Sequence, residues 1–217
     1  MRGFGERHQE ASRVNFTPVS LFIKICGLRT PEAVDACVES AVSAIGFVFA
    51  ESSVRFIEPA SVRELGERIP PSIEGVGVFL RVPVETVLER IGEAGLGTAQ
   101  LHGDYSADDI LAIEARGVHV IRALSVSEYL RDGSPAGRVL IDGDHPGSGA
   151  EFPATMLADS DLPPGWILAG GLTPSNVARR VRELAPSGVD VSSGVESERG
   201  VKSVDLIREF VDHARSA

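Results

Sequence analysis

Residues 22–40, FIKICGLRTPEAVDACVES, contain one complete unit of a strand followed by a helix. The β-branched and aromatic run at its start predicts a buried strand, and Thr30-Pro31 is a typical helix start because proline is tolerated in the first helical turn. Alternation along the strand places Lys24 and Cys26 on the same face. The unit recurs along the chain, and its repetition decides the fold.

The repeated pattern predicts eight strands, at residues 22–26, 44–49, 75–79, 98–101, 118–123, 139–142, 166–169 and 189–192. It predicts helices at residues 31–40, 60–68, 84–94, 107–115, 174–184 and 204–214, and two short ones around residues 127–130 and 154–157. Eight strand–helix units imply an α/β protein with a single (β/α)8 TIM barrel. We expect this domain to span residues 21–217, after an N-terminal extension over residues 1–20 that is disordered.

The composition excludes several classes of partner. A formal net charge of −10 repels nucleic-acid phosphates, and no basic stripe is interleaved with aromatic residues, so we expect no nucleic-acid partner. The longest apolar runs are far shorter than the roughly 20 residues that span a bilayer, so we expect no membrane segment. Two cysteines and no secretory signal fit the reducing cytoplasm. The sequence leaves a monomer and a homodimer open.

Candidate catalytic residues lie where the strands end, because parallel barrels carry their chemistry on that face. Asp142 ends an apolar strand, where a carboxylate is costly to bury unless it is paired or used; its alternative role is a turn in Asp142-Gly143. Cys26 points into the barrel, although a lone cysteine is more often inert packing. Lys24 and Asp190 also point inward from strands that become neighbours on closure, so we expect a buried ion pair.

Two further polar residues follow other strands. Arg55 has two open roles, either to bind a substrate carboxylate in its fork or to lie on the surface. His102, in the string Gln100-Leu101-His102-Gly103, is a candidate for catalysis, but we favour a hydrogen bond to a neighbouring loop.

Glycine-rich turns follow the last strands, at Gly170-Gly171 and at Ser192-Ser193-Gly194. Many barrels bind phosphate at these two positions through backbone amides and a helix N-terminus. Gly147-Ser148-Gly149, after the sixth strand, could close a third side. A single glycine-rich turn of this kind needs no explanation beyond reversal of the chain. Two such turns at the two expected positions favour a small phosphorylated substrate.

Six strings together carry a family resemblance: KICGL at residues 24–28, GFVF at 46–49, SVR at 53–55, QLHG at 100–103, LAGGL at 168–172 and VDVSSGVE at 189–196. In this order they resemble the phosphoribosylanthranilate isomerases of tryptophan biosynthesis. The resemblance implies an isomerase that converts N-(5-phosphoribosyl)anthranilate to 1-(2-carboxyphenylamino)-1-deoxyribulose 5-phosphate, an Amadori rearrangement that uses neither metal nor cofactor.

The same resemblance implies roles for the residues named above. Asp142 would protonate the furanose ring oxygen, Cys26 would remove the C2 proton, and Arg55 would bind the anthranilate carboxylate, with Gln100 and His102 as further substrate-binding residues. General acid–base catalysis then needs a protonated Asp142 and a deprotonated Cys26, the reverse of their usual order near neutral pH. The positive charge of Lys24 stabilises the Cys26 thiolate only if Asp190 does not fully neutralise that charge.

Two departures from the family pattern lie beside the predicted phosphate loops. The family's Phe-Asp-Trp is Phe152-Pro153-Ala154 here, and the Lys-Asp that usually opens the last helix is Lys202-Ser203.

Three other functions remain as alternatives to this isomerase. The first is the parallel isomerisation of histidine biosynthesis, which the cysteine in the first strand disfavours. The others are a paralogue acting on a modified anthranilate and a barrel without catalysis. Retention of Cys26, Asp142 and Arg55 together argues against the last.

Overall fold

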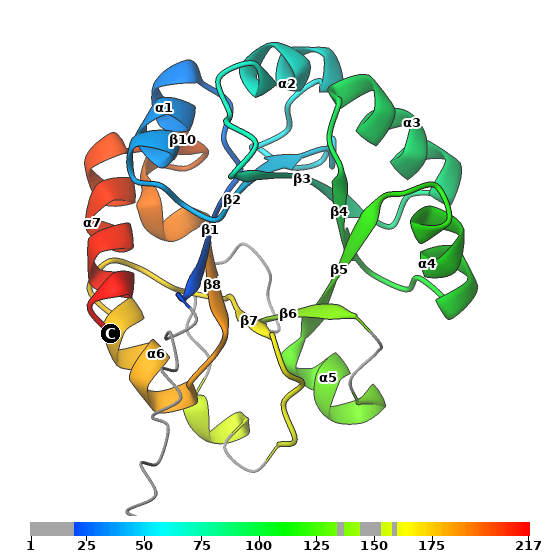
Figure 1. Cartoon of the computed structure of the whole chain (residues 1–217). Coiled ribbons are helices and arrows are strands. Elements are labelled where there is room, and N and C mark those ends of the chain that lie inside the picture. The colour runs from blue at the N-terminus through cyan, green and yellow to red at the C-terminus, as the bar shows by residue number, and fades with distance from the viewer. Residues whose placement is uncertain (1–19, 134–136, 144–152, 158–159) are drawn as a thin grey trace, which may run out of the picture.

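The computed structural model describes residues 20–133, 137–143, 153–157 and 160–217. Gly147, Ser148 and Gly149, together with residues 1–19 of the expected extension, lie outside this part. Eight parallel strands pair in chain order and close into a barrel, which confirms the predicted TIM barrel (Figure 1). They are β1 Phe22–Cys26, β2 Ala44–Val48, β3 Glu74–Leu80, β4 Thr98–His102, β5 His119–Ser125, β6 Arg138–Asp142, β7 Ile167–Leu168 and β8 Gly188–Val191.

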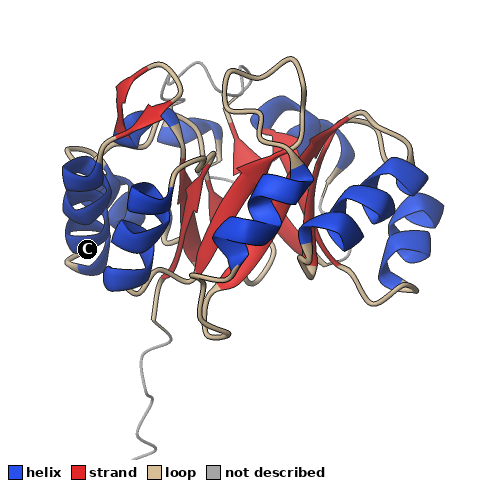
Figure 2. Ribbon diagram, turned by 90° about the horizontal axis from the view of Figure 1, so that it is seen from above, coloured by secondary structure: helices blue, strands red, loops and turns tan. Residues whose placement is uncertain are grey.

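Helices surround this barrel (Figure 2). They are α1 Pro31–Glu39, α2 Pro59–Gly66, α3 Val84–Ala94, α4 Ala107–Glu114, α5 Val126–Asp132, α6 Val177–Leu184 and α7 Val204–Arg215, with short 3-10 turns η1 Ala154–Met156 and η2 Ser193–Val195. A two-stranded hairpin, β9 Glu196–Glu198 and β10 Val201–Lys202, follows η2. No helix in the described part is long and apolar enough to cross a membrane.

Three details differ from the prediction. The helix predicted from residue 174 begins at Val177, because the Thr173 amide donates to Asn176 Oδ1 at 2.8 Å and closes a turn in front of it. The short helix predicted at residues 154–157 is the single 3-10 turn η1. The hairpin β9–β10 was not predicted, since its strands are only three and two residues long.

Polar side chains begin several helices. Thr30 caps α1, and Ser125 and Glu128 form a reciprocal capping box at the start of α5. Ser203, which stands where the family usually has aspartate, accepts a hydrogen bond from the Leu206 amide and caps α7. Serine and aspartate are comparable N-caps, so this departure preserves the start of the helix.

The barrel interior contains the predicted ion pair. Lys24 and Asp190 are direct partners in the β1–β8 register, and Lys24 Nζ lies 2.8 Å from Asp190 Oδ1. Burial lowers the pKa of Lys24, but the attraction of Asp190 outweighs it and the pKa is raised, so the ammonium stays charged. The apolar side chains around the pair are mostly small or β-branched: Ala44, Val76, Ile121, Ala123, Leu140, Ile167 and Ala169.

Replacing Lys24 by methionine should lower the free energy of unfolding by about 3–5 kcal/mol, because Asp190 would keep a buried charge without a partner. Urea unfolding followed by circular dichroism measures the effect. The matched control is Arg208→Met, which breaks the exposed Arg208–Glu39 pair and should cost less than about 1 kcal/mol. Equal costs for the two variants would contradict the prediction.

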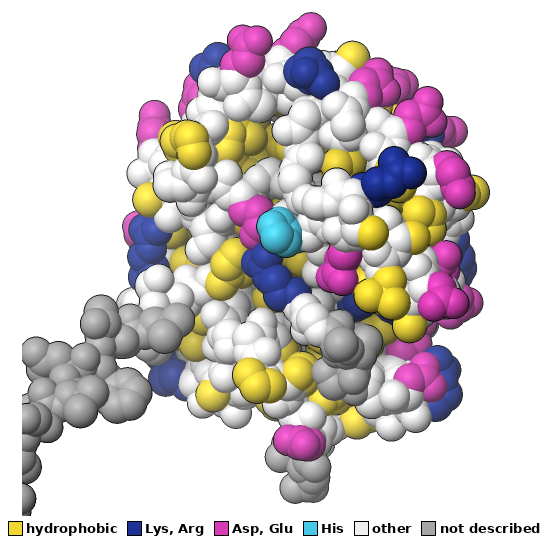
Figure 3. Space-filling model, turned by 45° about the vertical axis from the view of Figure 1, so that its right-hand side comes forward, with side chains coloured by type: hydrophobic (Ala, Val, Ile, Leu, Met, Phe, Trp, Pro, Cys, Tyr) yellow, Lys and Arg dark blue, Asp and Glu magenta, His cyan; other side chains and the backbone are white. Residues whose placement is uncertain are grey.

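Basic and acidic side chains are intermixed over the face seen in Figure 3. Among the residues coloured there, acidic groups follow much of the rim, and lysines and arginines are separated by other side chains. That face therefore presents no continuous basic area among its described residues.

Candidate active site

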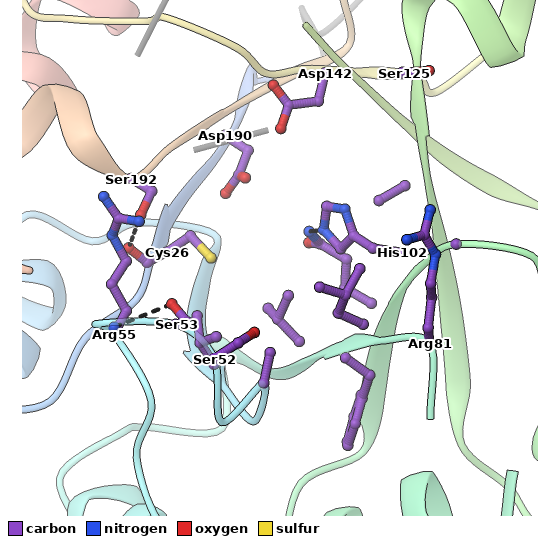
Figure 4. A pocket seen from close by; sticks show the side chains of 18 of the residues that line it. Cys26, Ser52, Ser53, Arg55, Arg81, His102, Ser125, Asp142, Asp190 and Ser192 are labelled. Atoms are coloured by element: carbon purple, nitrogen blue, oxygen red, sulfur yellow. Dashed lines mark hydrogen bonds between the residues drawn. The ribbon is translucent and has the colours of Figure 1, made fainter. Parts of the chain in front are cut away.

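A cavity of about 450 Å³ opens where the strands end (Figure 4). This volume falls in the usual range for sites that enclose small molecules. Outside the phosphate loops, five residues were predicted to act on the substrate. All five line this cavity: Cys26, Arg55, Gln100, His102 and Asp142. Within the described residues, no group of His, Cys, Asp or Glu side chains could hold a metal ion.

Asp142 is the last residue of β6, and its half-buried carboxyl faces this cavity. Burial raises its pKa to about 6, with a further contribution from the negative charge of Asp190, although the Gly143 amide donates to Oδ1 at 2.7 Å and opposes the shift. A carboxyl with this pKa is protonated in roughly a tenth of the molecules at pH 7, far more than an ordinary aspartate. Asp142 is therefore suited to donate a proton.

Cys26 ends β1 and faces the same cavity from another wall (Figure 4). It is 6% exposed, and burial raises the pKa of its thiol even though Lys24 and Lys202 act in the opposite direction. Asp190, the ion-pair partner of Lys24, raises the pKa of the thiol and opposes part of the effect of Lys24. In the structure as it stands the thiol is protonated at neutral pH, and the single proton of the pair resides on Cys26 rather than on Asp142.

Arg55 lies in the cavity wall. Of its two predicted roles, a position on the open surface is therefore excluded. Its Nε and Nη2 donate to the two oxygens of Glu196 at 2.6 and 2.9 Å. Lys202 Nζ lies 2.8 Å from the same carboxylate and 2.7 Å from the Ser192 carbonyl oxygen. Burial raises the pKa of Glu196, but the hydrogen bonds from Arg55 and Lys202 outweigh it and lower the pKa to about 2.

Gln100 and His102 point into the cavity from β4, two residues apart on one face of the strand. Their Nε2 atoms are 2.9 Å apart, so His102 bonds to its own strand and not, as we expected, to a neighbouring loop through its side chain. Burial lowers the pKa of His102 to about 4. The imidazole is therefore neutral at pH 7 and can offer one donor and one acceptor.

The loops after β7 and β8 meet beside the acid. A Cβ placed on Gly170 would lie 2.8 Å from Asp142 Oδ1, and one on Gly194 would lie 1.8 Å from the Leu172 carbonyl oxygen. The amides of Ser193 and Gly194 find no acceptor among the described residues. Gly171 and Ser192 belong to the same two loops, at which the sequence predicts phosphate binding, and the third predicted loop lies outside the described residues.

Replacing Gly194 by alanine should separate these two loops, because a Cβ cannot lie 1.8 Å from a backbone oxygen. We expect the unfolding free energy to fall by about 1–3 kcal/mol and the affinity for inorganic phosphate to fall at least about tenfold. Thermal unfolding and calorimetry measure the two effects. Gly92→Ala in α3, where a Cβ would meet nothing within 4 Å, is the control and should leave phosphate affinity unchanged.

The sequence analysis missed several residues that line the cavity or orient its wall. Arg81 and Ser125 follow or end β3 and β5, two strands whose ends we did not inspect. The same strand-end rule would have found them. Glu196 was quoted in a family string but given no role, because its partner Arg55 is 141 residues away and the hairpin that carries it was not recognised.

Proton donors and acceptors thus face one another across a cavity at the end of a parallel barrel, beside the glycine-rich loops that follow β7 and β8. The fold and this cavity define a TIM-barrel enzyme with an acid–base site.

Comparison with known proteins identifies the family. The model of the N-(5'-phosphoribosyl)anthranilate isomerase family matches residues 23–213. The isomerase of that name from Thermotoga neapolitana is 38% identical over 208 residues, which cover 89% of this chain and 98% of the relative. The chain belongs to the N-(5'-phosphoribosyl)anthranilate isomerase family of tryptophan biosynthesis, as the resemblance implied.

Solved structures agree. TrpF from Jonesia denitrificans is 39% identical with a TM-score of 0.81, over 91% of this chain and 98% of that one. A phosphoribosyl anthranilate isomerase in complex with reduced 1-(o-carboxyphenylamino)-1-deoxyribulose 5-phosphate is 32% identical with a TM-score of 0.82, over 91% of this chain and 100% of that one.

Proposed function

We propose that the protein isomerises N-(5-phosphoribosyl)anthranilate to 1-(2-carboxyphenylamino)-1-deoxyribulose 5-phosphate, with Asp142 as general acid and Cys26 as general base. The observation that carries this assignment is that both residues face one cavity from the ends of β6 and β1 (Figure 4). One proton must be delivered to the furanose ring oxygen and another taken from C2, and two proton-transfer groups on different walls of one cavity support this assignment.

The first step opens the sugar ring. Asp142 donates its proton to the ring oxygen as the C1–O bond breaks, and the nitrogen lone pair forms a Schiff base at C1. The raised pKa of Asp142, about 6, favours this donation. A bound phosphate dianion beside Gly170 would raise the pKa further, because negative charge disfavours the carboxylate.

The second step removes the C2 proton. The Cys26 thiolate accepts it, the electron pair forms the C1–C2 double bond of an enolamine, and the Schiff-base nitrogen accepts the displaced electrons. The enolamine becomes the ketone of the product when C1 gains a proton and the C2 hydroxyl loses one. Cys26 is then a thiol and Asp142 a carboxylate, which is the protonation state of the resting structure. Each turnover must therefore return one proton from the thiol side to Asp142.

The remaining groups bind the substrate. We assign the phosphate to the amides of the β7 and β8 loops, at Gly170, Gly171, Ser192, Ser193 and Gly194, and a third side to Gly147, Ser148 and Gly149. Gln100 and His102 provide neutral polar contacts along the opposite wall. Arg55 binds the anthranilate carboxylate through Nη1, the guanidinium nitrogen that Glu196 does not occupy.

Purified protein tests this function directly. We expect it to convert phosphoribosylanthranilate, measured by the loss of anthranilate-type fluorescence, and to restore growth of a tryptophan auxotroph that lacks the isomerase. Folded, well-expressed protein that does neither would remove the assignment.

We place the reaction in the cytoplasm. Cys26 and Cys37 are buried and free, and a reducing compartment keeps the thiol that the mechanism requires.

A further inference from the structure

Gln100 and His102 line the cavity from β4, and the hydrogen bond between their side chains determines what the histidine can do. We propose that Gln100 is a positioning residue that fixes His102 in the tautomer with its hydrogen on Nδ1. In this form His102 donates a hydrogen bond to a sugar oxygen of the substrate and cannot accept a proton. The inference rests on the proposed function and specifies how one of its binding residues works.

The two atoms that meet in this hydrogen bond leave one place for the hydrogen of the imidazole. Gln100 Nε2 belongs to an amide NH2 group, which only donates, and it lies 2.9 Å from His102 Nε2. The ring nitrogen must therefore accept, and an accepting nitrogen carries no hydrogen. A neutral imidazole has a single N–H group, so its hydrogen lies on Nδ1.

The surroundings of His102 keep its ring neutral. Burial lowers the pKa of His102 to about 4, and the positive charge of Lys24 lowers it further. Asp190 and Glu128 act in the opposite direction, and Arg81 lies beside the histidine (Figure 4). At pH 7 both ring nitrogens are thus committed, Nε2 to its hydrogen bond and Nδ1 to its own hydrogen.

Of the two side chains, the histidine is the one that can contact a ligand. Gln100 is 2% exposed, and its Oε1 is buried without a hydrogen-bond partner among the described residues. His102 is partly exposed in the cavity wall, and the described residues offer no hydrogen-bond partner to its Nδ1. Gln100 therefore acts on a ligand through His102.

The other contacts proposed for the substrate indicate which of its atoms meets this donor. The phosphate is assigned to the loops after β7 and β8, and the carboxylate to Arg55. The acceptors that lie between these two ends of the substrate are the oxygens of the sugar. A neutral N–H group suits them because they carry no net charge.

The fixed tautomer also protects the proton count of the site. Catalysis requires one proton on the pair formed by Cys26 and Asp142. A histidine with a free ring nitrogen and an ordinary pKa of about 6.5 would compete for that proton. Because the lone pair of its Nε2 is occupied by Gln100, His102 does not compete, and Cys26 remains the base.

Nitrogen-15 NMR of histidine-labelled protein without ligand measures the tautomer, and the His102 signals are recognised by their absence in His102→Asn. We expect the wild type to hold its hydrogen on Nδ1 and not to titrate above about pH 5. The reverse orientation of the Gln100 amide would place the hydrogen on Nε2. The spectrum therefore distinguishes the two arrangements.

Gln100→Met removes the donor at nearly the same side-chain volume. The His102 signals should then show both tautomers, and kcat/KM should fall about three- to tenfold. The thermal midpoint should stay equal or rise, because the buried unpaired oxygen is gone. Loss of activity without loss of stability is the result that a merely structural role of Gln100 would not give.

Gln100→Glu reverses the hydrogen bond. A carboxylate only accepts, so His102 should move its hydrogen to Nε2, and the negative charge should raise the pKa of the ring. We expect kcat/KM to fall at least about tenfold and a third titrating group to appear on the acid side of the pH profile.

Thr98→Val is the matched control. Thr98 lies two residues before Gln100 on β4, is also 2% exposed, and donates to Glu74 Oε1 at 2.7 Å. Its replacement should leave the tautomer of His102 and the pH profile unchanged.

Two results would overturn the inference and leave the isomerase assignment intact. One is a wild type with the hydrogen of His102 on Nε2, and the other is a Gln100→Met variant that keeps both the tautomer and kcat/KM. A folded wild type without isomerase activity would instead overturn the proposed function, and the role of His102 in substrate binding with it.

Discussion

Replacing Asp142 by asparagine is expected to lower kcat/KM for phosphoribosylanthranilate by about 10²- to 10⁴-fold, the usual contribution of a positioned proton donor. The amide keeps the shape and the hydrogen bond from the Gly143 amide but cannot protonate the ring oxygen. Because the loss lies in ring opening, kcat should fall far more than KM rises. Steady-state kinetics with freshly prepared substrate measures both.

The stability of the same variant provides its control. Burial raises the pKa of Asp142 above the value of the unfolded chain, so the ionised carboxyl destabilises the fold as the pH rises through about 6. Asparagine removes this penalty, and the variant should be at least as stable as the wild type at pH 7 and lose that advantage below about pH 4. A variant that is folded and retains near-normal kcat would refute the acid assignment.

Replacing Cys26 by serine is expected to lower kcat by a similar 10²- to 10⁴-fold and to alter the pH profile. The wild-type profile of kcat/KM should be a bell, since catalysis requires exactly one proton on the Cys26–Asp142 pair. Below about pH 6 both groups are protonated and no base remains; above the raised pKa of Cys26, beyond its ordinary 9.0, both are ionised and no acid remains. Serine does not ionise in this range, so the alkaline limb should disappear.

Cys37→Ser is the matched control for this experiment. Cys37 is buried in α1 away from the cavity, and burial raises the pKa of its thiol to about 12. Its replacement should leave both limbs of the bell in place even if it lowers stability. A bell that keeps its shape in both Cys26→Ser and Asp142→Asn would mean that neither residue carries the proton transfers.

The charge network around Arg55 shows how far the sequence analysis reached. Strand-end reasoning placed Arg55 at the mouth of the barrel, and the structure has it in the cavity wall. The partner that orients it, Glu196, sits on the unexpected hairpin together with Lys202, and the three form one buried set of ion pairs. No local pattern relates these positions, because the contact depends on closure of the barrel and on the path of the chain after β8.

The sequence alone determined the barrel, the inward pair Lys24–Asp190 and the residues at the strand ends, since strand alternation and the repeated strand–helix unit are local properties of the chain. It also carried the six family strings, the first of which contains Cys26. Only the tertiary structure decided that burial raises the pKa of Asp142 to about 6, that Glu196 occupies the fork of Arg55, and that Arg81 lines the cavity beside Gly103. These features depend on desolvation and on charged groups that the fold brings together from distant parts of the chain. The order of residues alone does not predict such contacts.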